Sequence, residues 1–216
     1  TRVPRLLHQI WLGDLPRPPA IAAWRERCAA QGRDYRLWDG PALARLGAMD
    51  HPVLRAMLDR GDLPGAADVA RYIILERLGG IYLDADFHPA FGAGDFDDYL
   101  PPAGLSSLVE DTPRLTGRGP MLLTNALIAT PPGHPVLAAI LDCLPQAMAR
   151  LPRAPAWWVT GPVIFTLFAR LVPLGIAAEG IIAARLPEGA PPAALETLRG
   201  AEGLLIDWKS WAPPAT

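Results

Sequence analysis

The chain has 216 residues, of which 50% are hydrophobic and 19% are charged, so it can bury a sizeable core and is not a disordered protein. Its 20 basic and 22 acidic residues leave a formal charge of -2, which excludes the broad positive field that a nucleic-acid partner needs. The length fits one domain over residues 1–216.

The two cysteines and the most apolar stretch of the sequence indicate the cellular compartment of the protein. Cys28 and Cys143 lie far apart and match no zinc-ligand spacing, so we expect free thiols in a reducing compartment. Residues 163–182 contain Arg170 and Glu179, which favours a buried helix and a turn over a transmembrane segment. The expected location is cytoplasmic, and a peripheral position at the inner face of a bacterial membrane stays open.

Strands and helices alternate along the chain. The predicted strands span residues 6–12, 35–38, 81–83, 121–129 and 204–206. The predicted helices span residues 20–31, 66–78 and 134–151, and another begins at 161–162. Residues 95–119, rich in glycine, proline and acidic side chains, predict a long ordered loop with short strands.

This alternation predicts an α/β fold with one open, mostly parallel central sheet that is flanked by helices. In such sheets, ligands bind at the carboxyl ends of the strands. Side chains that follow a predicted strand directly are therefore the first candidates for a site.

Asp84 and Asp86 follow the short apolar strand 81–83. Side chains two apart in a strand point the same way, so both carboxylates face one spot. Mn2+ and Mg2+ prefer oxygen ligands, and they often combine one or two carboxylates with substrate phosphates. The pair predicts a cation and diphosphate site, although exposed loop carboxylates would show the same pattern.

Asp68 and Arg71 lie three residues apart on the preceding helix and share one of its faces. Because this helix leads into the strand before Asp84, its polar face can border the same cleft. A surface ion pair of little energetic weight is the open alternative.

Polar and aromatic side chains also gather near the two ends of the chain. His8 and Gln9 interrupt an apolar strand, and Trp11 follows, which indicates a surface on which a base could stack. A core tryptophan beside a satisfied histidine explains the pattern equally well. Near the other end, residues 207–211 combine a carboxylate, a hydroxyl and an aromatic ring.

Three ordered blocks of the sequence resemble one family. They are VPRLLHQIWLG at residues 3–13, ADVARY at 67–72 and GGIYLDAD at 79–86. These blocks are similar to glycosyltransferases with a DXD-containing sugar-binding region. That group includes initiating mannosyltransferases of yeast, bacterial capsule and lipopolysaccharide transferases and, more distantly, the clostridial glucosylating toxins.

The resemblance implies a GT-A-type, Rossmann-like fold and a hexosyltransferase that uses Mn2+ or Mg2+. It implies transfer from a nucleotide-sugar donor, a UDP- or GDP-sugar, to a glycan, lipid-linked or protein acceptor, usually with retention of configuration. Bacterial polysaccharide biosynthesis is the implied setting. Residues 1–90 would hold the nucleotide, and residues 91–216 would hold the acceptor and close the site.

The resemblance also assigns roles by position. The donor contacts would be His8, Gln9, Ile10, Trp11, Asp68, Arg71, Asp84, Ala85, Asn125, Ser210 and Trp211. The catalytic group would be Asp68, Arg71, Asp84 and Asp86. The metal ligands would be Asp84, Asp86 and Asp207, and Asp207 takes the place of a histidine or glutamate found in many relatives.

Two other classes of protein stay open. A phosphatase of the haloacid-dehalogenase type also uses Asp-x-Asp with Mg2+, but its motif usually lies on the first strand and it needs a lysine, whereas Lys209 is the only lysine here. A nucleotide-sugar-binding module without catalysis is the non-enzymatic alternative. No covalent nucleophile stands out, which favours front-face transfer over double displacement.

Overall fold

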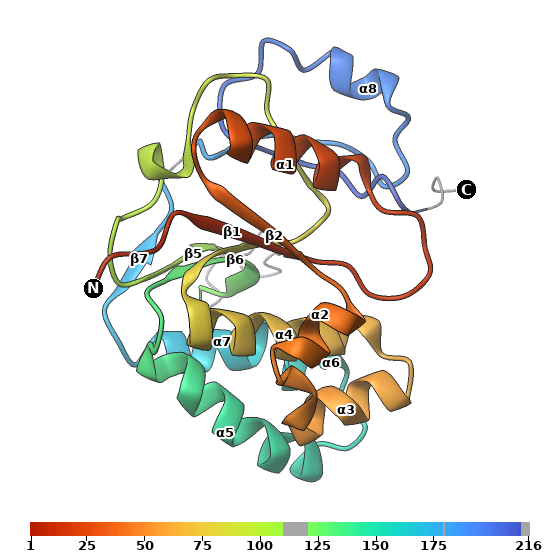
Figure 1. The fold of residues 1–216 in the computed structure, drawn as a ribbon, viewed down its shortest axis with the longest axis vertical. Helices are drawn as coiled ribbons and strands as arrows, with labels where there is room; N and C mark the ends of the chain where they lie inside the picture. The colour runs from red at the N-terminus through yellow and green to blue at the C-terminus, as the bar shows by residue number, and fades with distance from the viewer. Residues whose placement is uncertain (110–120, 179, 213–216) are drawn as a thin grey trace.

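A computed structural model describes residues 1–109, 121–178 and 180–212 (Figure 1). Within these ranges, the main sheet has six strands in the order β2-β1-β3-β6-β5-β7. These strands are β1 (Leu6–Ile10), β2 (Asp34–Trp38), β3 (Gly80–Leu83), β5 (Leu105–Val109), β6 (Leu123–Thr130) and β7 (Leu174–Ile176). Only β6 runs antiparallel to its neighbours, which confirms the mostly parallel α/β sheet.

Helices cover both faces of this sheet. They are α1 (Pro19–Ala30), α2 (Gly40–Arg45), α3 (Pro52–Asp59), α4 (Leu63–Leu78), α5 (Pro135–Arg150), α6 (Ala156–Val159), α7 (Pro162–Ala169) and α8 (Ala193–Glu196). Short 3₁₀ helices span Ala48–Asp50 and Phe96–Asp98. In Figure 1, α1 lies on one face of the sheet, and α4, α5 and α7 lie on the other.

A second sheet of three strands departs from the single open sheet that the sequence predicts. Its strands are β4 (Phe87–Pro89), β8 (Ile182–Arg185) and β9 (Leu205–Asp207), in the order β4-β9-β8. Strands as short as β4 carry too few residues for a periodic signal. The antiparallel pairing of β4 with β9 sets Asp207 opposite Phe87, one residue after Asp86.

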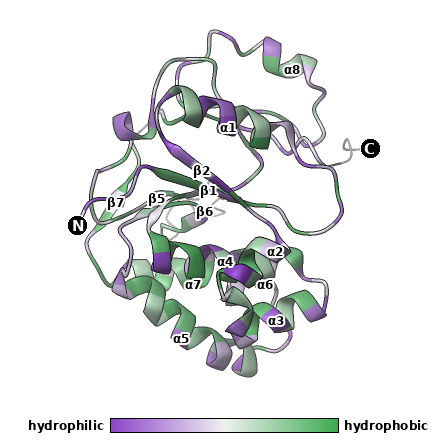
Figure 2. Cartoon of the chain, viewed as in Figure 1, coloured by the Kyte–Doolittle hydropathy of each residue, from purple (hydrophilic) through white to green (hydrophobic). Residues whose placement is uncertain are grey.

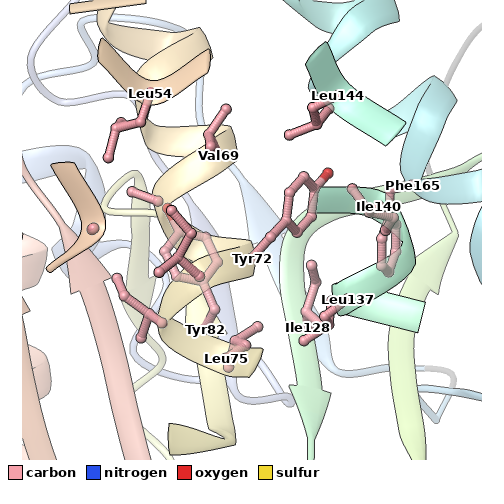
Figure 3. Packing of buried hydrophobic residues seen from close by; sticks show 14 of the residues in the cluster. Leu54, Val69, Tyr72, Leu75, Tyr82, Ile128, Leu137, Ile140, Leu144 and Phe165 are labelled. Atoms are coloured by element: carbon pink, nitrogen blue, oxygen red, sulfur yellow. The ribbon is translucent and has the colours of Figure 1, made fainter. Parts of the chain in front are cut away.

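The larger part of the core lies between the main sheet and α3, α4, α5 and α7 (Figure 3). Tyr72 on α4 stacks on Phe165 of α7, with ring centroids 6.2 Å apart, and Leu137 and Ile140 of α5 fill the same layer. The sequence of α7, PVIFTLFA, is hydrophobic over most of its length, and Figure 2 shows hydrophobic residues throughout the helical layer on this side of the sheet. This packing fixes α4 against the sheet.

Glycine is required where α4 passes into β3. Gly79 and Gly80 have φ angles of +61° and +100°. A Cβ atom on Gly79 would lie 2.5 Å from Pro132 N, and one on Gly80 would lie 2.6 Å from Leu6 O. Only glycine combines these φ angles with such close backbone approach. The chain can therefore reverse here and run back along α4.

No helix within the described ranges is both long enough and apolar enough to cross a bilayer. The long loop expected over residues 95–119 includes a 3₁₀ helix and β5 in its first part. From residue 110 on, it lies outside the described residues.

Candidate active site

A cavity of about 670 Å³ opens at the carboxyl ends of β1 and β3. The site residues predicted from the sequence that line it are Ile10, Trp11, Asp68, Arg71, Asp84, Ala85, Asp86, Asn125, Asp207 and Trp211. His8, Gln9 and Ser210 are not part of this lining. Its volume and its mixed polar and aromatic lining are typical of small-molecule sites.

The hairpin of α4 and β3 explains why Asp68, Arg71 and Asp84 meet. Arg71 precedes Gly79 by eight residues of helix, a rise of about 12 Å. Asp84 follows Gly80 by four residues of extended chain, about 13 Å. Arg71 and Asp84 therefore lie at nearly the same distance from the turn. Because the turn at Gly79 and Gly80 reverses the chain, the two residues lie side by side.

Arg71 is the centre of a buried ion-pair array. Its Nη2 lies 3.1 Å from Asp68 Oδ1, and its Nη1 lies 3.1 Å from Asp84 Oδ1. Nη1 also donates to the Asn125 carbonyl at 2.7 Å, and the guanidinium lies 4.4 Å from the centroid of the Tyr82 ring. The side chain of Arg71 is 5% exposed, which excludes the surface ion pair left open above.

Burial alone would lower the pKa of Arg71, but Asp84, Tyr82 and Asp68 raise it above its usual range. The guanidinium therefore keeps its charge at the base of the cavity. A fixed cation in a site of low polarity stabilises anions strongly.

Asp68 is held by neighbours from three segments of the chain. Besides Arg71, its carboxylate accepts from Asn125 Nδ2 at 2.7 Å and from Thr160 Oγ1 at 3.0 Å. Burial raises the pKa of Asp68 to about 6, although Arg71 opposes the rise. Thr160 was not among the predicted site residues, because a lone threonine before Gly-Pro carries no chemical signature.

Asp84 is positioned by the side chain of Tyr82 and by a backbone hydrogen bond to β6. Tyr82 Oη donates to Asp84 Oδ1 at 2.6 Å, and the Asp84 backbone N–H donates to the Ala126 carbonyl at 2.8 Å. Tyr82 was not among the predicted site residues. Its position two residues before Asp84, on the same face of the strand, is the signal that could have found it.

Asp86 and Asp207 come together through the second sheet. The Trp208 backbone N–H donates to the Asp86 carbonyl at 2.7 Å. Burial raises the pKa of Asp86 to about 7, and the carboxylates of Asp84 and Asp207 add to the rise. Burial also raises the pKa of Asp207, despite Lys209 and Arg185.

In the part of the chain that the structure describes, no group of three His, Cys, Asp or Glu side chains forms a cation site on its own. Asp84 Oδ1 is turned toward Arg71 and Tyr82, which explains why the carboxylates line one cavity without closing into a cage. Three mutually repelling carboxylates in one cavity fit a divalent cation that takes its other ligands from a substrate.

His8 and Gln9 lie behind the cavity, where their hydrogen bonds fix the backbone that carries the site. His8 Nε2 donates to the Gly79 carbonyl at 2.9 Å, and Trp38 Nε1 donates to His8 Nδ1 at 3.1 Å. Gln9 Nε2 donates to the Asp84 carbonyl at 3.3 Å, while Gln9 Oε1 accepts from Tyr35 at 3.0 Å. Both polar side chains are fully buried.

Two tryptophans that lie 200 residues apart in the chain, Trp11 and Trp211, meet at the rim of the cavity. Trp11 and Trp211 pack edge to face, with ring centroids 6.3 Å apart, and both line the cavity. Ser210 lies next to this pair, and its Oγ is buried without a hydrogen-bond partner in the described residues. The rim thus offers aromatic faces of the kind that stack on a base or sugar.

The fold is that of GT-A glycosyltransferase domains. Residues 43–93 match the family described as the glycosyltransferase sugar-binding region containing the DXD motif, which confirms the resemblance drawn from the sequence. The matched segment holds Asp68, Arg71, Asp84 and Asp86.

One curated relative is inositol phosphoceramide mannosyltransferase 3 of Schizosaccharomyces pombe, 26% identical over 171 residues. The match covers 76% of this chain and 44% of that protein, so the chain spans less than half the length of this relative.

Two solved structures support the fold. The PaToxG glycosyltransferase has a TM-score of 0.58 at 17% identity, over 79% of this chain and 70% of that one. The UDP-bound glycosyltransferase domain of the YGT toxin has a TM-score of 0.51 at 12% identity, over 82% of this chain and 80% of that one. At these identities, the likeness concerns the fold alone.

Proposed function

We propose that this chain is a metal-dependent glycosyltransferase. It moves a hexosyl group from a UDP- or GDP-sugar to a glycan, lipid-linked or protein acceptor, with retention at the anomeric carbon. The observation that carries the proposal is the Asp68–Arg71–Asp84 array, which opens into the same cavity as Asp86 and Asp207. A nucleoside diphosphate sugar is bound by positive charge at its diphosphate, by hydrogen bonds at its sugar and by aromatic contacts at its base, and Arg71, Asp68 and the Trp11–Trp211 pair support such a placement.

Mn2+ or Mg2+ would be held by Asp84, Asp86 and Asp207, and diphosphate oxygens would complete its ligands. The pKa of Asp86, raised by burial and by its neighbouring carboxylates, supports a need for positive charge at this point. When bound, the cation supplies stabilisation of the negative charge that develops on the leaving diphosphate.

The side chains of the chain bind and orient the donor. Asp68, fixed by Asn125 and Thr160, accepts hydrogen bonds from sugar hydroxyls and so sets the direction of the anomeric carbon. Arg71 faces the diphosphate end with its permanent charge. Trp11 and Trp211 flank the nucleotide and shield the site from water.

For the transfer itself we propose a front-face route. The bond between the anomeric carbon and the diphosphate oxygen breaks, while the acceptor oxygen bonds to the same face of that carbon. The acceptor proton passes to the departing oxygen, so no enzyme base is consumed. Asp68 and Asp84 are both tied to Arg71, which supports this front-face route over a covalent sugar–enzyme intermediate. A sugar trapped on either carboxylate would overturn it.

The test is hydrolysis of donors in the absence of acceptor. The purified chain is incubated with Mn2+ and a panel of UDP- and GDP-sugars, and release of UDP or GDP is measured. We expect release from one donor, lost on addition of EDTA and lost in Asp86→Ala. A matched control is Asp59→Ala, because Asp59 lies on the surface of α3 away from the cavity.

The same assay separates the alternatives. Donor binding without release under any condition would favour a binding module that lacks catalysis. Phosphate release from simple phosphomonoesters would favour the phosphatase, whose motif usually lies on the first strand, whereas Asp84 and Asp86 follow β3. A cytoplasmic setting and a role in bacterial polysaccharide biosynthesis remain part of this proposal.

A further inference from the structure

The segment from the end of α5 to β7 has an unusual charge pattern. Residues 143–178 contain Arg150, Arg153 and Arg170 and no acidic residue. The same segment holds large exposed hydrophobic side chains, which are Leu151 (49% exposed), Trp157 (43%), Trp158 (55%), Leu167 (61%), Leu171 (77%) and Ile176 (40%). Soluble proteins rarely leave so many large apolar side chains in water within one short segment.

On the outer side of α7, apolar residues form a stripe in which Leu167 and Leu171 are exposed and Val163 is half-buried. Val163, Leu167 and Leu171 recur every four residues and so share one side of the helix and its C-terminal extension. The opposite side buries Ile164 and Phe165 in the core. A helix that is apolar on both sides normally has something packed on each. The outer side of α7 lacks such a covering element among the described residues.

The stripe continues toward the cavity through α6. Helix α6 packs on α7 and is joined to it by Thr160 and Gly161. It carries the exposed pair Trp157 and Trp158, of which Trp157 also lines the cavity. Leu171 lies nine residues beyond Pro162, about 14 Å along the helix direction. The apolar surface therefore extends from the cavity mouth along α7.

Arginines border this surface. Arg150, Arg153 and Arg170 are exposed, and none has an ion-pair partner within the described ranges. Tryptophan together with arginine at the edge of an apolar stripe matches the boundary between lipid headgroups and acyl chains. Unpaired positive charge matches an anionic lipid surface. A protein partner would instead need an acidic face of its own to match these arginines.

We propose that the docking face, made of Trp158, Leu167 and Leu171 with the arginines Arg150, Arg153 and Arg170, binds the surface of an anionic lipid bilayer. The apolar side chains enter the headgroup boundary and the arginines contact lipid phosphates. Docking in this way brings the cavity mouth to the membrane, where a lipid-linked acceptor could enter past Trp157. That consequence rests on the proposed function, whereas the docking itself does not.

The test is sedimentation of the whole chain with vesicles, without donor or metal. Vesicles of phosphatidylcholine that contain phosphatidylglycerol are compared with pure phosphatidylcholine, at low and high salt. We expect binding to the anionic vesicles only, weakened by salt. Each of Arg153→Gln and Arg170→Gln is expected to weaken binding about fivefold. Trp158→Ser with Leu171→Ser is expected to weaken it more than about tenfold.

The matched control is Phe91→Ser, which removes an exposed aromatic residue that packs on Arg199, away from α7. It should leave binding unchanged, and thermal melts confirm that every variant is folded. Absence of vesicle binding, or binding that the face variants do not alter, would overturn the proposal. So would self-association in solution that Trp158→Ser and Leu171→Ser abolish, because the face would then join two copies. Donor hydrolysis does not enter this readout, so failure here leaves the transferase proposal untouched.

Discussion

Arg71 joins the two carboxylates on which the candidate site depends. Its guanidinium bridges Asp68 and Asp84, and the three side chains are largely withdrawn from water. Removal of one partner from a buried ion pair leaves an uncompensated charge, which costs far more than loss of a surface pair. Arg71 is thus expected to serve stability as well as donor binding.

Arg71→Gln should lower the free energy of unfolding by about 3–5 kcal/mol, because Asp68 and Asp84 lose their common partner. Urea denaturation measures this. The matched control is Arg199→Gln, whose ion pair with Glu196 is exposed and whose loss should change stability by no more than about 0.5 kcal/mol. Equal effects of the two substitutions would contradict the picture of Arg71 as the centre of the array.

His8 gives the fold a dependence on pH. Burial is the main reason that the pKa of His8 falls to about 4. Protonation would also break the hydrogen bond that Nδ1 accepts from Trp38. Because the unfolded chain binds the proton at a higher pH than the folded chain, stability is complete above the unfolded pKa of about 6.5 and is lost as the pH falls toward 4.

Between about pH 7 and pH 4, the wild type should lose on the order of 3 kcal/mol more stability than His8→Asn, which cannot titrate. Unfolding free energies of both proteins across this range measure the difference, and the comparison cancels the titration of the carboxylates. Parallel pH profiles would show that His8 is not buried in its neutral form.

At the residue scale, the sequence predicted which side chains carry the chemistry, but not which residues surround each of them. Asp84 and Asp86 could be found because they lie together after one strand, and Asp68 and Arg71 because helical spacing is local. The sequence fitted His8 equally well as a contact to the donor and as a buried core residue. Its role is set by Trp38, thirty residues away, and no local pattern reports such a contact.

At the scale of elements, the turn between α4 and β3 positions the site. Gly80→Ala would place a Cβ 2.6 Å from Leu6 O, at a φ of +100°. Gly104→Ala is the matched control, since its φ is +78° but no atom lies within 4 Å of the new Cβ. Both substitutions carry backbone strain of about 1–2 kcal/mol, and only Gly80→Ala adds a collision.

Gly80→Ala should therefore destabilise the protein by about 1–3 kcal/mol more than Gly104→Ala. Thermal or urea unfolding of the two variants measures this difference directly. If they are equally stable, the close approach of β3 to β1 at this point does not constrain the turn.

Most long elements followed from periodicity, while the short ones did not. The helix predicted over 66–78 begins three residues earlier, at Leu63, because Asp62 caps it through Gly65 N and Pro64 occupies its first turn. β4 and β8 were not predicted. β4 has only three residues and pairs with β9, more than a hundred residues away, and this pairing leaves no mark in the local sequence.

At the scale of the whole molecule, the cavity draws on almost the entire chain, from Ile10 to Trp211. The predicted division into a nucleotide part over residues 1–90 and a closing part over 91–216 is consistent with this placement but remains a prediction. Sequence order alone could not show that Asp207 faces Asp86, since the second sheet brings them together.

The central claim is that these carboxylates hold a cation and a nucleoside diphosphate together. Calorimetric titration of the chain with UDP and with GDP, each with Mn2+ and with EDTA, tests it most directly. One nucleotide should bind at least about tenfold more tightly with Mn2+, a coupling of about 1.4 kcal/mol or more, and Asp86→Asn should abolish that gain. Nucleotide binding that is the same with Mn2+ and EDTA, or no binding of either nucleotide, would contradict the account.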